Sequence, residues 1–312
     1  MKRQSIVIGT RSSQLALVQA RQIKEELEQN LREAGPDVRL KEIETTGDRI
    51  LDRPLARIEG KGVFLKEIEK ALLAEEIDLA VHSLKDVPTD MPEDLRLAAL
   101  PLRADPRDVL VAPGFDSLAE LPEGAVLGTG SSRRRTQILS RRPDLEVKPV
   151  RGNVDTRLEK LHSEDYDGLV LAAAGLIRLG REEAISTYLN PRRFLPAAGQ
   201  GGLALEIRQD DVMLAKKLQE LEDGDTACCL RAERSLLAAL GGGCHVPIGC
   251  YAHIAGEEDE LIEITGMVGD GEGGKSYRET LQGSRNRAED TARELAGMLL
   301  ERGADELLEE EE

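Results

Sequence analysis

A strand-like run followed by the residues Gly-Thr-x-Ser-Ser occurs twice in this sequence, over residues 6–13 and again over residues 125–132. A short apolar run that ends in a polar loop and then a helical pattern is typical of a buried strand that leads into a helix. A second pair of similar segments follows in the same order, because residues 166–172 and residues 76–82 are each a strand-like segment that follows a charged helix. The two matches predict two similar α/β domains.

In such domains a ligand binds beyond the carboxyl ends of the strands, where both Gly-Thr-x-Ser-Ser loops are expected to lie. Serines at these positions cap helix N-termini, and the free N–H groups there attract a carboxylate or a phosphate. The two loops therefore predict binding of an anionic ligand.

The order of the predicted elements gives the domain boundaries. Proline-rich residues 101–106 are a plausible hinge out of the first domain, residues 190–202 are the return, and the apolar run 203–207 rejoins the first domain as a strand. From Gly224 a helix to Leu240, three strands (248–254, 261–268 and 276–281) and a last helix from Arg287 follow. We predict two similar doubly wound domains, residues 1–101 with 202–219 and residues 107–195, and a small C-terminal α+β domain over residues 224–312.

Composition excludes several functions. A net charge of −17 argues against binding to nucleic acid or an anionic membrane, and 2% aromatic residues argue against a stacking surface for single strands. We expect a cytoplasmic protein with reduced cysteines, since there is no signal-like or membrane-spanning stretch and only four cysteines. We also expect a monomer. Cys244, His245, Cys250 and His253 fit no familiar zinc spacing, so no metal site is predicted.

The charge is uneven along the chain. Between Gly128 and Arg193 there are 13 basic residues against 9 acidic ones. A basic run is most often a solvated helix face, but in so acidic a protein it also suits a small anionic ligand.

A glycine-rich turn, Leu240 to Gly249, presents Cys244 between the helix and the first strand of the C-terminal domain. Glycine commonly ends helices and free cysteine is commonly buried, so the turn is explained by a glycine cap beside a buried thiol. It is explained equally well by an accessible, functional thiol.

Eight segments in a fixed order carry a family resemblance over nearly the whole chain. They are residues 10–17 (TRSSQLAL), 60–64 (GKGVF), 80–88 (AVHSLKDVP), 132–134 (SRR), 150–158 (VRGNVDTRL), 174–179 (AGLIRL), 195–201 (LPAAGQG) and 242–249 (GGCHVPIG). Together they resemble the porphobilinogen deaminase family, also called hydroxymethylbilane synthases. The resemblance implies a transferase of tetrapyrrole (haem) biosynthesis that adds four porphobilinogen units head to tail, each with loss of ammonia, and releases hydroxymethylbilane.

The resemblance also implies a covalent cofactor, a dipyrromethane held by a thioether to Cys244 that primes the growing chain. Asp86 matches the catalytic aspartate, which hydrogen-bonds pyrrole N–H groups and stabilises the positive charge that develops as ammonia leaves. Arginine suits the acetate and propionate groups of each pyrrole because its guanidinium can grip a carboxylate with two N–H groups. The implied cofactor ligands are Lys85, Asp86, Thr129, Ser131, Arg133 and Arg134, and the implied substrate ligands are Arg11, Ser13, Phe64, Arg151, Arg157 and Arg178.

Other charged residues receive no such role. We expect His82 to be a hydrogen-bonded core residue, and we expect five further arginines to lie at the surface: Arg135, Arg141, Arg142, Arg192 and Arg193.

Two other functions suit part of the pattern. A non-enzymatic anion receptor with the periplasmic-binding-protein architecture also has two similar α/β domains, but it needs neither Cys244, Asp86 nor a third domain. A nucleotide or phosphate enzyme is less favoured, because the sequence lacks a Gly-Lys-Ser/Thr phosphate loop.

Overall fold

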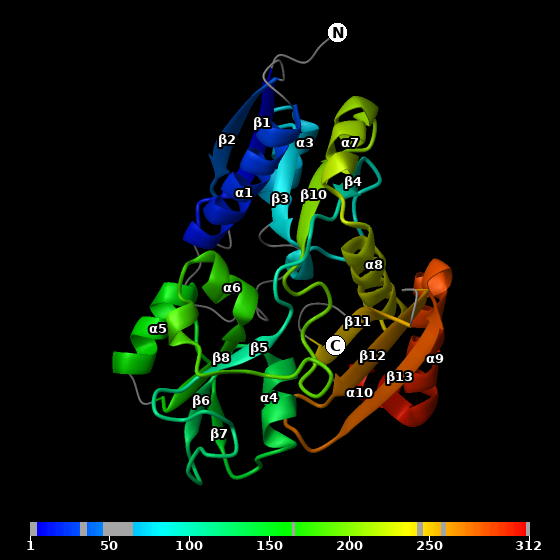
Figure 1. Cartoon of the computed structure of the whole chain (residues 1–312). Helices are drawn as coiled ribbons and strands as arrows, with labels where there is room; N and C mark the ends of the chain where they lie inside the picture. Colours follow the sequence, from blue (N-terminus) through cyan, green and yellow to red (C-terminus); the bar gives the residue numbers. More distant parts are fainter. Residues whose placement is uncertain are drawn as a thin grey trace. The chain divides into compact units, whose positions relative to one another are not determined.

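The computed structural model describes residues 5–31, 36–45, 65–163, 166–241, 246–256 and 260–309 of the 312-residue chain. Contacts divide the chain into two compact units, residues 1–104 with 202–227 and residues 105–201 with 228–312 (Figure 1). Each unit is described by itself. No helix among the described residues is long and apolar enough to cross a membrane.

The first unit contains a five-stranded mixed sheet in the order β2-β1-β3-β10-β4. β1 pairs in parallel with β2 and β3, while β10 is antiparallel to β3 and β4. The strands are β1 (Ser5–Arg11), β2 (Asp37–Ile43), β3 (Leu79–Ser83), β4 (Leu95–Ala99) and β10 (Leu203–Arg208). β10 is the predicted strand that returns to the first domain, so that prediction is confirmed.

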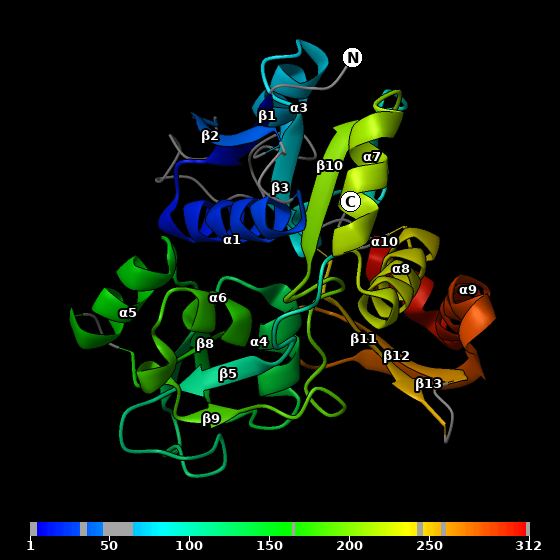
Figure 2. The same cartoon turned by 45° about the horizontal axis from the view of Figure 1, so that its top comes forward.

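Helices cover both faces of this sheet. Apolar residues of α1 (Gln14–Leu31) and α7 (Val212–Leu218) share one core with Ile6, Ile8 and Leu205 of the strands. α3 (Lys66–Leu73) packs on the opposite face, against Ala80 and Leu95. Figure 2 shows α1 along the sheet face. Helices on both faces make this a doubly wound domain, as predicted.

The second unit contains a sheet of the same design, in the order β7-β6-β8-β5-β9. β6 is parallel to β7 and β8, and β5 is antiparallel to β8 and β9. Its strands are β5 (Asp108–Val111), β6 (Val126–Gly128), β7 (Glu146–Lys148), β8 (Gly168–Ala172) and β9 (Thr187–Tyr188). One face is covered by α4 (Ser132–Leu139), and the other by α5 (Val154–Ser163) and α6 (Ala173–Arg178).

The two sheets are repeats of each other, which confirms the repeat predicted from the sequence. In the first sheet, Asp78 just before β3 accepts a hydrogen bond from the N–H of Val7 in β1 at 2.8 Å. In the second sheet, Asp167 just before β8 accepts one from the N–H of Val126 in β6 at 2.7 Å. The strand registers agree, since Gly9 lies opposite Ala80 and Gly128 opposite Leu169.

This register corrects the second sequence match by one residue. The sequence comparison set residues 166–172 against residues 76–82, which aligns Asp167 with Ile77. In the structure Asp167 is the counterpart of Asp78, so residues 166–172 correspond to residues 77–83. Apolar strands match almost equally well in neighbouring registers, and only the hydrogen bonds distinguish them.

The end of the chain forms an antiparallel sheet in the order β11-β12-β13. These strands are β11 (Ile248–Ala255), β12 (Leu261–Gly269) and β13 (Ser276–Ser284), and they follow α8 (Gly224–Ala239). α8 and α9 (Ala288–Leu299) enclose an apolar core with this sheet, and α10 (Asp305–Glu309) completes it. This is the α+β arrangement predicted for the C-terminal domain.

Candidate functional site

In the first unit, the loop after β1 carries Arg11 and Ser13. The Ser13 hydroxyl accepts a hydrogen bond from the N–H of Ala16 at 3.4 Å, so it caps α1 as predicted. The buried Thr10 hydroxyl donates to the Ala16 carbonyl at 3.1 Å, which fixes the loop to the first turn of the helix. Arg11, partly exposed, therefore stands on a rigid turn at the carboxyl end of β1.

Asp86 and Lys85 lie on a single 3₁₀ turn, Leu84–Asp86, directly after β3. Buried Leu84 and Val87 anchor this turn on either side, while Asp86 itself is exposed and Lys85 is partly exposed. The Leu84 N–H donates to the Gly202 carbonyl at 3.0 Å. An exposed carboxylate on a firmly held backbone can be approached by a substrate without rearrangement of the fold.

Gln19 connects the two loops of this unit, and the sequence did not single it out. It is buried on α1, and its side-chain amide donates to the Ser83 hydroxyl at 2.9 Å. Ser83 directly precedes the turn that bears Lys85 and Asp86. The bond joins the start of α1 to the end of β3, beside the turn that carries Asp86.

His82 is a core histidine, as predicted. Its Nε2 lies 2.9 Å from Oε2 of Glu206, and both side chains are buried. Burial, with the charge of Glu206 nearby, raises the pKa of Glu69 on α3 above its ordinary value. The buried pair and the half-buried Glu69 form an acidic cluster on the α3 face of the sheet.

In the second unit, the loop after β6 carries Thr129 and Ser131. The Ser131 hydroxyl accepts the Arg134 N–H at 3.4 Å and caps α4, and the buried Thr129 hydroxyl accepts the Ser131 N–H at 3.3 Å. The predicted cap is therefore present in both repeats. The helix it begins carries Arg133 and Arg134 in its first turn.

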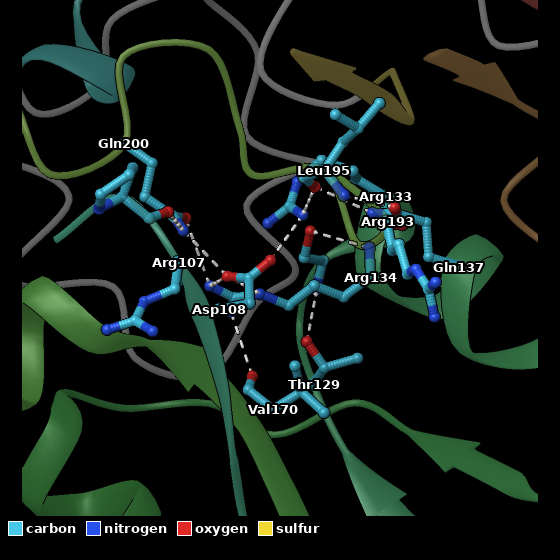
Figure 3. Close-up of polar contacts among 12 residues, drawn as sticks. Arg107, Asp108, Thr129, Arg133, Arg134, Gln137, Val170, Arg193, Leu195 and Gln200 are labelled. Carbon is cyan, nitrogen blue, oxygen red and sulfur yellow. Dashed lines mark hydrogen bonds and ion pairs between the residues drawn. The ribbon is translucent and has the colours of Figure 1, made fainter. Parts of the chain in front are cut away.

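Arg133 and Arg134 are both buried, and both pair with Asp108, a residue that the sequence interpretation missed. Figure 3 shows the Asp108 carboxylate beside the two guanidinium groups. Arg133 Nη1 donates to Oδ2 of Asp108 at 2.7 Å and to the Leu195 carbonyl at 2.5 Å. Arg134 donates to Oδ1 through Nε at 3.0 Å and Nη2 at 2.7 Å, and its Nη1 donates to the Val170 carbonyl at 3.1 Å.

The two arginines keep the buried Asp108 carboxylate ionised. Burial alone raises the pKa of Asp108, but the charges of Arg133 and Arg134 outweigh that effect and lower the pKa to about 2. Asp108 is therefore ionised, and two guanidinium charges face one carboxylate charge. The cluster keeps a net positive charge in the interior of the unit.

Arg151 and Arg157 add to this positive charge. Arg157 lies in the first turn of α5, and its Nε donates to the carbonyl of Gly152 in the preceding loop at 2.9 Å. Burial, together with the charges of Arg134 and Arg151, lowers the pKa of Arg157 to about 10. The charge of Arg157 is thus affected by both Arg134 and Arg151, and a concentration of guanidinium groups of this kind suits an anionic ligand.

Arg178 lies at the end of α6, and its Nη2 donates to the Gly201 carbonyl at 3.0 Å. The predicted residues of the second unit thus gather at the carboxyl ends of β6 and β8 and on the adjoining helices. Lys85, Asp86, Arg11 and Ser13 form the corresponding set in the first unit.

Cys244 and Phe64 lie outside the described residues, but the segments that flank Cys244 do not. Gly241 has a φ of +65° and its N–H donates to the Ala238 carbonyl at 3.0 Å, so it is the glycine cap expected at the end of α8. On the other side, the Cys250 N–H donates to the Pro196 carbonyl at 2.9 Å. Both ends of the turn are therefore fixed to the fold.

Buried Glu233 of α8 links these flanks and was not recognised in the sequence. Its carboxylate accepts the N–H of Gly199 at 2.7 Å and that of Ala252 at 3.0 Å. It joins the helix before the turn to the strand after it. An acidic residue on a helix beside Arg231 and Arg234 is typical of an exposed position, so no local signal marks it.

The arginines expected at the surface divide into two groups. Arg141, Arg192 and Arg193 are exposed. Arg135 and Arg142 are half-buried, contrary to expectation, because Arg135 pairs with Glu272 at 2.5 Å and Arg142 donates to carbonyl groups of residues 118–122.

Comparison with known proteins matches the chain along its length. Residues 6–216 match the family model described as porphobilinogen deaminase, dipyromethane cofactor binding domain, and residues 227–301 match porphobilinogen deaminase, C-terminal domain. The porphobilinogen deaminase of Syntrophotalea carbinolica is 48% identical over 99% of this chain and 96% of its own length. That of Bacillus subtilis is 44% identical over 98% of this chain and 96% of its own.

Solved structures give weaker similarity. The methionine-binding protein MetQ has a TM-score of 0.44 and 13% identity, over 70% of this chain and 89% of its own. A periplasmic domain of BvgS from Bordetella pertussis has a TM-score of 0.41 and 14% identity, over 70% and 87%.

Proposed function

Since this chain belongs to the porphobilinogen deaminase family, we propose that Asp86 is its catalytic carboxylate and Cys244 the attachment point of its dipyrromethane. The enzyme condenses four porphobilinogen units head to tail, with release of ammonia, and yields hydroxymethylbilane for tetrapyrrole biosynthesis. The dipyrromethane supplies the primer for this condensation.

The donor set of the second unit fits a group with several carboxylates. Arg134 and Arg151 both act electrostatically on Arg157, and Asp108 pairs with Arg134. The observation that carries the proposal is the buried Arg133–Arg134–Asp108 cluster, in which two guanidinium groups share one carboxylate. Arg157 adds to it, since burial and then the charges of Arg134 and Arg151 lower its pKa, and a bound anion would favour its charged form. We assign Thr129, Ser131, Arg133 and Arg134 to the cofactor, and Arg151, Arg157 and Arg178 to substrate carboxylates.

The first unit supplies the other charges. Asp86 accepts hydrogen bonds from pyrrole N–H groups and stabilises the positive charge that develops on the substrate as its amino group leaves. Lys85, on the same turn, pairs with a cofactor carboxylate, and Arg11 and Ser13 bind substrate carboxylates. Phe64, which lies outside the described residues, is assigned to the substrate because an aromatic ring can stack on a pyrrole.

The test is a set of three variants: Cys244→Ala, Asp86→Asn and, as a control, Asp90→Asn, which removes an exposed carboxylate from the loop that follows Val87. We expect Cys244→Ala to lack the dipyrromethane mass and any turnover. We expect Asp86→Asn to fold and to lose about 100-fold or more in kcat, since it removes charge stabilisation from the transition state. Asp90→Asn keeps full activity.

Intact mass, a colour reaction for pyrroles and product formation are the measurements, in a host that makes porphobilinogen. Normal turnover by Cys244→Ala would reject the attachment site. Near-normal turnover by Asp86→Asn would show that another carboxylate does the chemistry.

We further propose that the enzyme is a cytoplasmic monomer with three domains, residues 1–101 with 202–219, residues 107–195 and residues 224–312. The separate apolar cores that pack against each of the three sheets support this division. Light scattering on the purified protein tests the monomer, cell fractionation tests the compartment, and limited proteolysis tests the boundaries.

A further inference from the structure

Asp108 and Gln200 both contact the guanidinium group of Arg134. They belong to the two crossing segments, residues 105–108 and 195–201, through which the chain enters and leaves this part of the second unit. Asp108 is the first residue of β5, and Gln200 lies near the end of the second crossing segment. Both side chains are buried. Figure 3 shows Gln200 and Arg134 on either side of the Asp108 carboxylate.

Gln200 makes three bonds with its one amide group. Its Nε2 donates to Oδ1 of Asp108 at 2.9 Å and to the Pro106 carbonyl at 2.7 Å, and its Oε1 lies 3.5 Å from Nη2 of Arg134. The amide thus contacts the carboxylate, the guanidinium and the backbone of the first crossing segment. A side chain with this many buried partners is held in one orientation.

Counting donors shows how tightly Arg134 is held. A guanidinium group has five N–H groups. In Arg134, Nε and one Nη2 hydrogen point to Asp108, the second Nη2 hydrogen faces Gln200, and one Nη1 hydrogen points to the Val170 carbonyl. Among the described residues no acceptor is found for the second Nη1 hydrogen, and its direction is set by the other four.

We propose that Asp108 and Gln200 are positioning residues, which fix the Arg134 guanidinium so that its remaining N–H meets a carboxylate of the cofactor or substrate. The proposal rests on the role of Arg134 given above. Its consequence is that carboxylate recognition depends on the crossing segments at 105–108 and 195–201, and not on α4 alone.

The chain offers a matched control in Gln137. Gln137 and Gln200 are each 1% exposed, and each has bonds from both ends of its amide. Gln137 holds the backbone of Leu195, donating to its carbonyl at 2.9 Å and accepting its N–H at 2.7 Å, and its recorded bonds involve neither Asp108 nor the Arg134 side chain. Replacing either residue by methionine removes a buried amide, but only Gln200→Met releases Arg134.

The experiment compares Gln200→Met with Gln137→Met for unfolding by urea, for cofactor content by intact mass, and for KM and kcat with porphobilinogen. We expect similar losses of stability in the two variants. We expect Gln200→Met alone to show incomplete cofactor loading and, in its loaded fraction, a KM raised about tenfold with a smaller change in kcat. Equal KM values in the two variants would overturn the proposal.

Two further variants keep the result unambiguous. Gln200→Asn retains the amide on a shorter side chain and is expected to fold as the wild type does. Its KM is expected to lie between the wild-type and Gln200→Met values. If Gln200→Met does not fold and Gln200→Asn has the wild-type KM, the proposal is also overturned. Arg134→Gln tests the premise separately. A fully loaded and active Arg134→Gln would reject the role of Arg134 itself, whereas an inactive Arg134→Gln beside an unaffected Gln200→Met rejects only the positioning role.

Discussion

The two repeated sheets have the same strand order and register, yet they bury opposite kinds of charge. In the first, the buried pair is His82 with Glu206, in the middle of β3 and β10. Strand registers place Leu171 and Val111 at the corresponding positions of the second sheet, where they belong to the apolar core. In the second sheet the buried charges are Asp108, Arg133 and Arg134, and their counterparts in the first are Leu203, Gln14 and Leu15.

The difference teaches which positions of this fold can be used for chemistry. The repeated parts are the strand order, the aspartate before the third strand and the serine cap at the helix start. At the carboxyl ends of the parallel strands, one unit presents an exposed carboxylate, Asp86, beside Lys85 and Arg11, and the other presents a group of arginines. A common scaffold thus supports two different sets of charged groups, since substitutions at these ends leave the sheet unchanged.

The largest loss of stability is expected when one residue of the second sheet is replaced by its counterpart from the first. Asp108→Leu places the counterpart Leu203 at this position and leaves two buried guanidinium groups without their carboxylate. Removal of one partner from a buried charge cluster costs about 3–5 kcal/mol, so we expect an unfolded or severely destabilised second unit. Urea unfolding followed by circular dichroism measures the loss.

The control replaces all three buried charged residues by their counterparts from the first sheet. In Asp108→Leu with Arg133→Gln and Arg134→Leu, all three residues match the first sheet and no buried charge is left unpaired. We expect most of the stability to return without any enzymatic activity, because charge triads are replaceable by apolar groups at little cost. If this triple variant is no more stable than Asp108→Leu, the two sheets are not interchangeable at these positions.

Acid unfolding gives an independent check on Asp108. Its pKa is lowered from 3.8 to about 2, so its contribution to stability is complete above pH 4 or so and is lost as the pH falls toward 2. The shift corresponds to roughly 2 kcal/mol. The unfolding free energy of the triple variant is therefore expected to fall less steeply over this range than that of the wild type.

A smaller effect is expected for the reverse exchange in the first sheet. Glu206→Val and His82→Leu each import the residue of the second sheet and leave the other partner buried alone, at a cost of about 2–3 kcal/mol. The double variant restores an apolar pair, so we expect it to be more stable than the sum of the single losses predicts, by about 1–3 kcal/mol in a double-mutant cycle. Strict additivity of the two losses would mean that the pair does not act as a unit.

The sequence predicted those features of the fold that local pattern determines. The two Gly-Thr-x-Ser-Ser loops, the return of β10 and the three strands of the C-terminal sheet follow from runs of apolar residues bounded by turns. The register of the second repeat did not follow, because Leu79 and Ala80 are both apolar and either can be set against Leu169. Only the bond from Val126 to Asp167, which matches the bond from Val7 to Asp78, determines it.

The candidate site shows the same division. The resemblance named Arg133 and Arg134, but nothing near Asp108 in the sequence indicates that it pairs with them, since 25 and 26 residues separate them. A polar residue before the apolar run 109–111 is equally typical of an exposed strand end. Long-range pairs such as this depend on the order of the strands in the sheet, and the residue pattern of a single segment does not determine that order.

The smallest expected effect tests the part that the two sheets share. Asp78→Ala and Asp167→Ala each remove the carboxylate that accepts a valine N–H, and each is expected to cost about 1 kcal/mol, the value of one such hydrogen bond. Asp78 also lies 3.4 Å from a guanidinium nitrogen of Arg208, so its loss is expected to be the larger by a few tenths of a kcal/mol. Hydrogen exchange at Val7 and Val126 locates each effect. If Asp167→Ala leaves the exchange of Val126 unchanged while Asp78→Ala accelerates that of Val7, the aspartate is a feature of the first sheet alone, and the repeat extends only to strand order.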